Sequence, residues 1–171
     1  DGTLSVPLKY YAAHTGRFGG SEKINLQNLP RGSKLRNAIQ AASGEMLYIA
    51  DLSNIEARML AWLAKEDDLV QAFAAGEDVY SNFASQIYGK KVTKENKLER
   101  YVGKTAILGL GYGMGADKYQ AILKQGSPSI DVTKDTALGI VTQYRAMYPN
   151  IPALWSIGKQ LLFSMLDRTD M

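Results

Sequence analysis

The sequence contains no cysteine and a single histidine, which excludes several kinds of site at once. Without cysteine there are no disulfides, thiolate metal ligands or cysteine nucleophiles, a composition that fits a reducing cytoplasm. One histidine, His14, argues against a histidine-based zinc site and against a Ser/His/Asp triad. Apolar runs are short and are broken by Gly, Lys or Asp, so we expect a soluble protein without a membrane span.

The positive charge of the chain is concentrated in two stretches. The net charge is only +3, yet residues 1–40 and residues 90–104 each contain six basic and two acidic residues. The rest of the chain is therefore acidic. Two basic clusters suggest phosphate-bearing partners such as nucleic acid, although a solvated charged face would have the same composition.

Local patterns predict an α+β fold that is predominantly helical. Residues 1–45 are rich in Gly, Ser, Asn and Pro, which favours loops and short strands, one of them at residues 8–13. GEMLYIAD, residues 44–51, has the pattern of a buried strand that ends at an aspartate. Further helices are expected at about 68–75, 78–88, 94–113, 116–125, 133–147 and 152–167.

The segment IADLSNIEAR places a carboxylate where that strand gives way to a helix. Asp51 ends the expected strand, and Mg²⁺ prefers oxygen ligands of this kind while leaving room for substrate phosphates. Ser53 and Glu56 have the spacing of a capping box, so a helix should begin here with Glu56 in its first turn. The alternative is that Asp51 only caps a turn and Glu56 only completes the box.

The stretch RYVGKTAILGLGYG repeats four side chains at intervals of four residues: Arg100, Lys104, Leu108 and Tyr112. Such a repeat forms a stripe along one side of a helix. Two cations, an aliphatic side chain and a ring match the order of triphosphate, sugar and base in a nucleotide. Glycines at its end, among them Gly113, are tolerated where a helix bends or approaches something closely. An ordinary amphipathic helix edge would show the same spacing.

A third stretch, HTGRFGGSEKINLQNLPRGSKLR, combines basic and amide side chains in a glycine-flanked setting. Its polar residues suit hydrogen bonding to backbone phosphates and groove edges of a nucleic-acid duplex. The residues concerned are Arg17, Asn25, Gln27 and Asn28. A polar surface loop explains the pattern nearly as well.

Together and in this order, the three stretches resemble the polymerase domain of family A DNA polymerases, the group of bacterial DNA polymerase I and many phage replicative enzymes. TGR followed by NLQNLP is similar to the duplex-contacting segment ahead of the palm. DLSNIEAR is similar to the first catalytic motif, and RxxxKxxxLGxxYG to the fingers helix. The resemblance covers roughly residues 13–155 and implies a partial palm at residues 1–52 followed by an all-helical fingers subdomain at residues 53–171.

This resemblance implies template-directed DNA synthesis, in which a dNTP is transferred onto a primer 3′-hydroxyl during DNA replication. Asp51 and the backbone carbonyl of Leu52 would bind Mg²⁺. Arg100 and Lys104 would hold the triphosphate and neutralise the charge of the leaving pyrophosphate. Expected partners are primer–template DNA, dNTP and the remainder of a polymerase in a bacterial cell or a phage-infected host, with no membrane.

The other site residues follow from the same resemblance. Glu56 would crowd the 2′ position of the sugar and so reject ribonucleotides. Tyr112, next to Gly113, would stack at the templating site and hydrogen-bond to Glu56. Contacts with primer–template DNA would come from Arg17, Asn25, Gln27 and Asn28.

Three departures from the family pattern limit how far the roles of the family's residues apply to this chain. Position 108 is Leu where family members usually have Phe or Tyr, so sugar and base would meet an aliphatic wall. Tyr80 stands where a histidine is usual, and its phenol can donate a hydrogen bond to a phosphate but brings no positive charge. The second catalytic carboxylate belongs to a His-Asp-Glu motif that does not occur in these 171 residues.

We therefore expect a polymerase fragment that does not extend a primer alone. The thumb and the rest of the palm, with the His-Asp-Glu motif, would have to come from elsewhere. The alternative from another functional class is a non-catalytic nucleic-acid-binding module that reuses the fingers fold. Such a module would bind duplex DNA regardless of added nucleotide.

Overall fold

The computed structural model describes residues 4–23, 25–30 and 32–166, so residue 167, expected at the end of the last helix, lies outside the described residues. The chain divides into two compact units, residues 1–51 and residues 52–171, each of which is described by itself. The predominantly helical α+β class is confirmed. None of the helices in the described ranges combines the length and apolar character needed to cross a membrane.

The first unit begins with a short antiparallel hairpin. Strand β1 (Leu8–Lys9) pairs with β2 (Gly19–Gly20), and Leu8 lies opposite Gly20. The strand expected at residues 8–13 is therefore only two residues long. Tyr11 has a φ of 51°, which is incompatible with strand geometry and turns the chain out of the pairing.

Two short helical elements follow, and each is capped by a polar side chain. The 3₁₀ turn η1 (Leu26–Asn28) begins after Asn25, whose Oδ1 accepts a hydrogen bond from the Gln27 backbone N–H at 3.1 Å. Ser33 caps helix α1 (Lys34–Asn37). Both are local structures formed by neighbouring residues, since neither contains a buried side chain.

The buried strand expected at residues 44–51 is wrong. No helix or strand is formed there, and the side chains of Tyr48 and Ile49 are 87% and 92% exposed. A strand is stabilised by hydrogen bonds to a neighbouring strand, and the described residues of this unit supply only the β1–β2 pair. An apolar sequence pattern therefore cannot by itself produce a strand here.

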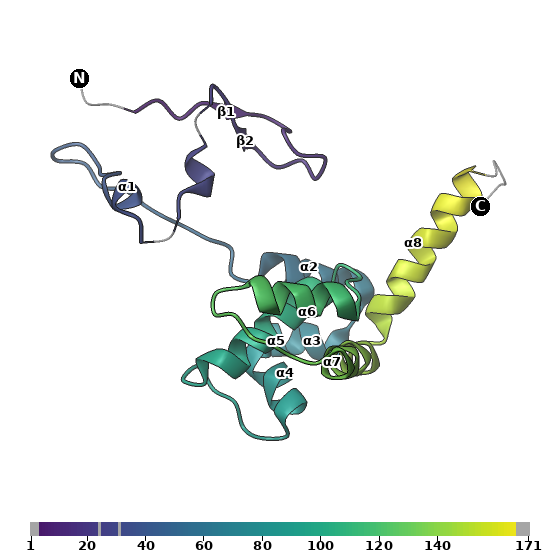
Figure 1. Ribbon diagram of the computed structural model, residues 1–171. Coiled ribbons are helices and arrows are strands. Elements are labelled where there is room, and N and C mark those ends of the chain that lie inside the picture. Colours follow the sequence, from purple (N-terminus) through teal and green to yellow (C-terminus); the bar gives the residue numbers. More distant parts are fainter. Residues whose placement is uncertain (1–3, 24, 31, 167–171) are drawn as a thin grey trace. The chain divides into compact units, whose positions relative to one another are not determined.

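The second unit is an assembly of helices (Figure 1), and glycines or prolines separate all of them except α2 and α3. Its helices are α2 (Ile55–Ala64), α3 (Asp67–Ala74), α4 (Val79–Tyr88), α5 (Lys97–Leu110), α6 (Ala116–Gln125), α7 (Lys134–Met147) and α8 (Asn150–Leu166).

Several helix boundaries differ from the prediction: α5 begins at Lys97 and not near residue 94, and α8 begins at Asn150 and not near residue 152. The capping box at Ser53 is wrong, because α2 begins after Asn54, which has a φ of 55° and makes no side-chain cap hydrogen bond. Helix α5 ends at Leu110 instead of continuing to residue 113. Tyr112 and Gly113 lie in the turn that follows, where Gly113 has a φ of 76° that suits glycine.

Helix α5 is central to this unit and contacts α2, α4, α6 and α7. Its buried face includes Val102, Ala106 and Leu110, which belong to one core with aromatic side chains of α4 and α7. The crossing of α4 and α5 is close at Gly103, where an added Cβ would meet the Tyr80 backbone carbonyl. Small residues at this crossing therefore bring the backbones of α4 and α5 close together.

The beginning of helix α8 is anchored to the segment between α2 and α3. The carboxylate of buried Glu66 accepts a hydrogen bond from the Asn150 backbone N–H at 3.0 Å, which satisfies a free donor at the helix N-terminus. The Asn150 side chain in turn donates to the Lys65 carbonyl. The second half of α8 extends away from the other helices of the unit (Figure 1).

Candidate nucleotide-binding site

An apolar pocket of about 370 Å³ lies between α2 and the C-terminal part of α5. Three of the predicted site residues line it, namely Glu56, Leu108 and Tyr112, and the remainder of the lining is mainly aliphatic. Tyr112 is 72% exposed, because the turn after α5 carries it to the rim. The structure therefore brings the residues expected to contact sugar and base into one cavity of a size typical for small-ligand sites.

A second, polar pocket of about 230 Å³ lies at the N-terminal part of α5. It contains Arg100 and Tyr80, both predicted site residues. The other lining residues come from the start of α2, the segment before α4 and the loop before α5: Ser53, Asn54, Arg58, Gly76, Glu77, Asp78 and Lys94. Three of its side chains are cationic and two are acidic, so the pocket is strongly polar with mixed charge.

Arg100 is held by a carboxylate within this pocket. Its Nε donates to Asp78 Oδ2 at 2.7 Å and its Nη2 donates to Asp78 Oδ1 at 3.1 Å, a two-bond fork between planar groups. Ser81 Oγ also donates to Asp78 Oδ2, at 2.8 Å. Burial raises the pKa of Asp78, but the hydrogen bonds from Arg100 and Ser81 and the positive charge of Arg100 outweigh it and hold the pKa below its ordinary value.

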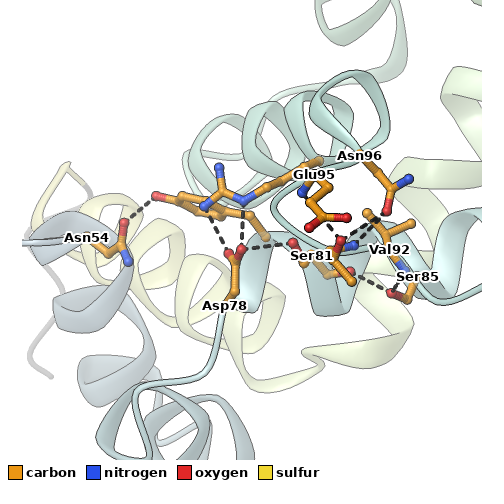
Figure 2. Close-up of polar contacts among 10 residues, drawn as sticks. Asn54, Asp78, Ser81, Ser85, Val92, Glu95 and Asn96 are labelled. Atoms are coloured by element: carbon orange, nitrogen blue, oxygen red, sulfur yellow. Dashed lines mark hydrogen bonds and ion pairs between the residues drawn. The ribbon is translucent and has the colours of Figure 1, made fainter.

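Tyr80 is buried beneath the same guanidinium. The Arg100 Cζ lies 5.3 Å from the centre of the Tyr80 ring, within the range of a cation–π contact. The phenol donates its hydrogen to Asn54 Oδ1 at 2.6 Å, a contact visible beside Asn54 in Figure 2. Burial raises the pKa of Tyr80. The phenol hydrogen is thus already used, which differs from the expected donation to a phosphate.

Lys104 lies one turn after Arg100 on α5 and is half-buried. It lines neither of the two pockets. Within the described part of the chain its ammonium group makes no hydrogen bond or ion pair. It is a cation on the same helix as Arg100 whose charge remains available to an anion.

The polar pocket also contains residues that sequence reasoning missed. Arg58 donates from Nε to the Ser53 carbonyl at 3.0 Å and from Nη1 to the Phe73 carbonyl at 3.2 Å, so it ties the start of α2 to the end of α3. Asn54 and Asp78 each contact a predicted site residue. Asp78 had one visible signal, an acidic residue directly before a helix, but nothing local pairs it with an arginine on the following helix.

The residues proposed for magnesium do not form a complete metal site. Asp51 and Leu52 are exposed, at the end of the first unit and the beginning of the second. Among residues 4–23, 25–30 and 32–166, no group of three His, Asp or Glu side chains could hold a metal ion. One carboxylate and one carbonyl are fewer oxygen ligands than Mg²⁺ requires.

The residues expected to contact DNA all belong to the first unit. Arg17 is exposed in the loop of the β1–β2 hairpin, where its carbonyl accepts hydrogen bonds from the Ala12 and Ala13 backbone N–H groups. Gln27 and Asn28 are exposed on η1, whereas the Asn25 side chain caps that turn.

Comparison with known proteins agrees with the resemblance. A sequence model described as DNA polymerase family A matches residues 2–159. A thermostable DNA polymerase I of Thermus thermophilus is 31% identical over 92% of this chain and 18% of its own length. DNA polymerase I of Pseudomonas aeruginosa is 36% identical over 89% of this chain and 16% of its own length. The chain thus spans less than a fifth of these relatives, and it belongs to DNA polymerase family A.

Proposed function

We propose that this chain is the nucleotide-binding part of a template-directed DNA polymerase, with a partial palm at residues 1–52 and a fingers subdomain at residues 53–171. One observation carries the proposal. Two pockets follow α5 from its basic beginning to the turn after it, which carries Tyr112, and the start of α2 lines both pockets. A nucleoside triphosphate changes in the same order along its length, from anionic phosphates to the sugar and then the flat base.

The basic part of α5 is suited to the triphosphate. Arg100 offers planar N–H donors to phosphate oxygens, and Lys104 adds a point charge one turn away. Both cations would reduce the repulsion between phosphates and neutralise the charge that develops as pyrophosphate leaves.

The apolar pocket is suited to the sugar and base. Leu108 supplies an aliphatic wall, and Tyr112 at the rim, beside Gly113, offers an exposed ring for stacking. Glu56 provides the one carboxylate in the lining, in a position to exclude a 2′-hydroxyl. In this proposal Tyr80 acts through Arg100, as a platform beneath the guanidinium, and not as a phosphate ligand.

The remaining parts of the polymerase reaction need groups outside this chain. Family A DNA polymerases are generally Mg²⁺-dependent, and we assign Asp51 and the Leu52 carbonyl as a partial contribution to that site. Arg17, Asn25, Gln27 and Asn28 would lie along primer–template DNA. The second carboxylate would come from the rest of the polymerase in the cytoplasm, so the chain alone should not extend a primer.

Titration of the chain with the Mg²⁺ complex of a dNTP tests the proposal. Arg100→Ala and Lys104→Ala should each weaken binding about tenfold or more, because each removes charge-assisted contacts to phosphate. Lys118→Ala is a matched control, since Lys118 is an exposed lysine on α6 that lines neither pocket. Equal affinities in all four proteins would contradict the proposal.

The same proteins separate the polymerase fragment from a non-catalytic binding module. If the chain binds duplex DNA but no dNTP, with Arg100→Ala unaffected, the module is correct instead. A mixture of the chain with a complementary polymerase fragment that carries the His-Asp-Glu motif should extend a primer. Robust extension by the chain alone would contradict the assignment as a partial active site.

A further inference from the structure

Asp78 is placed to control the geometry of the arginine on α5. It directly precedes α4, and its carboxylate receives both bonds of the fork from Arg100 and a third from Ser81. Figure 2 shows this carboxylate beside Ser81, with dashed contacts on both oxygens.

The fork uses only one edge of the guanidinium. Arginine has five N–H donors, and Asp78 occupies one on Nε and one on Nη2. The other three point away from Asp78, and within the described residues they have no hydrogen-bond partner. A second planar or tetrahedral anion can therefore bind the opposite edge while Asp78 stays in place.

The plane of the guanidinium is fixed as well as its edge. The Tyr80 ring lies on one face at 5.3 Å, and the Tyr80 hydroxyl is in turn fixed by Asn54 at the start of α2. These contacts connect the beginnings of α2, α4 and α5 through four side chains. An arginine without them would lose rotational freedom when it binds a phosphate, whereas Arg100 has already lost it on folding.

We propose that Asp78 is a positioning residue for nucleotide binding, which presents the free edge of Arg100 to the triphosphate of a dNTP. This proposal rests on the function proposed above. It differs from two other roles for the pair. A competing carboxylate would weaken nucleotide binding, and a purely structural ion pair would leave it unchanged.

A double-mutant cycle on the full chain tests the proposal, with the Mg²⁺ complex of dTTP as the probe. Asp78→Asn should raise the Kd about three- to tenfold, since it removes the charge and one acceptor of the fork. Arg100→Lys keeps the positive charge but removes the two planar N–H donors that form the fork. If Asp78 acts through Arg100, Asp78→Asn should have no further effect on Kd in the Arg100→Lys background.

Ser81→Ala provides the structural control, because it removes the third hydrogen bond to Asp78 without touching Arg100. Thermal unfolding of every variant should show that Ser81→Ala and Asp78→Asn both lose stability, while Ser81→Ala keeps the parent Kd. An equal loss of affinity in Ser81→Ala, additive effects in the cycle, or an unchanged or lower Kd in Asp78→Asn would overturn the proposal.

The two proposals fail in different ways. If Arg100→Ala and Lys104→Ala weaken dTTP binding while Asp78→Asn does not, the nucleotide site stands and the positioning role is wrong. If the parent chain binds no dTTP, the nucleotide site is wrong and the positioning role falls with it.

Discussion

Gly103 lies where α5 crosses α4, and there is no room for a methyl group at this position. An added Cβ would meet the Tyr80 carbonyl and would lie 3.0 Å from the Ala84 Cβ. A backbone carbonyl cannot move without the helix that carries it. Gly103→Ala should therefore lower the free energy of unfolding by about 1–3 kcal/mol, although alanine has the higher helix propensity. Denaturant unfolding followed by circular dichroism measures the change.

Gly139 on α7 is the matched control for this prediction. It is also inside a helix, but no atom lies within 4 Å of its ideal Cβ position. Gly139→Ala should raise stability by about 0.5–1 kcal/mol, because only the entropy of the unfolded chain changes. A gain of stability in both variants would contradict the close crossing.

Leu108 lines the apolar pocket at a position where the family resemblance leads us to expect an aromatic ring. Its aliphatic side chain offers less flat contact area to a sugar or base than a ring does. In a full-length polymerase containing this segment, Leu108→Phe should lower the KM for dNTPs and change the ratio of dideoxynucleotide to deoxynucleotide incorporation. Steady-state kinetics with both substrates would test it, and unchanged values would show that position 108 does not contact the nucleotide.

Among the helices, those with a clear apolar period were predicted well from the sequence. The expected helices at 68–75 and 133–147 agree within one residue with α3 (Asp67–Ala74) and α7 (Lys134–Met147). Helix boundaries likewise depend on nearby residues. Helix α4, for example, ends at Gly89, which adopts a positive φ of 60°. Helix formation is largely a local property, so a local pattern is sufficient to find it.

Elements that depend on distant partners were not predictable in the same way. The apolar pattern of residues 44–51 predicted a strand, but a strand exists only beside another strand. Likewise, Arg100 was identified from its own helix, whereas the carboxylate of Asp78 that orients it belongs to the segment before α4. A contact between side chains of two different elements cannot be recognised from the residue spacing within either element.

Three buried tyrosines, in α6, in α7 and directly after α7, should limit stability at alkaline pH. Burial raises the pKa of Tyr119, Tyr144 and Tyr148 above the ordinary value of 10.0, and Tyr148 reaches about 12. Below pH 10 these phenols are neutral in both states and cost nothing. As pH rises further, they ionise in the unfolded chain first, so stability should fall by about 1.4 kcal/mol per pH unit for each phenol.

Urea unfolding at several alkaline pH values, together with phenolate absorbance, measures this dependence. Tyr144→Phe should reduce the slope of the free energy of unfolding against pH by the contribution of one phenol. Tyr112→Phe, at an exposed position, should leave this slope unchanged. Ionisation of all the phenols before any loss of helix would contradict the burial of these rings.

For the whole molecule, the two units should differ sharply in resistance to proteolysis. Every residue of the hydrophobic core cluster lies between Ala57 and Ile151, whereas Tyr48 is 87% exposed in a segment without helix or strand. Proteases need locally unfolded chain, so brief chymotrypsin digestion should cut near Tyr48 first and release an intact helical unit. Mass spectrometry identifies the first cut.

The released helical unit should keep the unfolding transition of the parent chain, because the cut removes none of the residues in the core. It should also keep the dNTP affinity, since Arg100, Lys104 and both pockets belong to residues 52–171. Binding of duplex DNA should instead decrease, because Arg17, Gln27 and Asn28 are lost with the first unit. A helical unit that binds DNA as the parent does would place the DNA contacts on the second basic cluster, at residues 90–104, and not on the first.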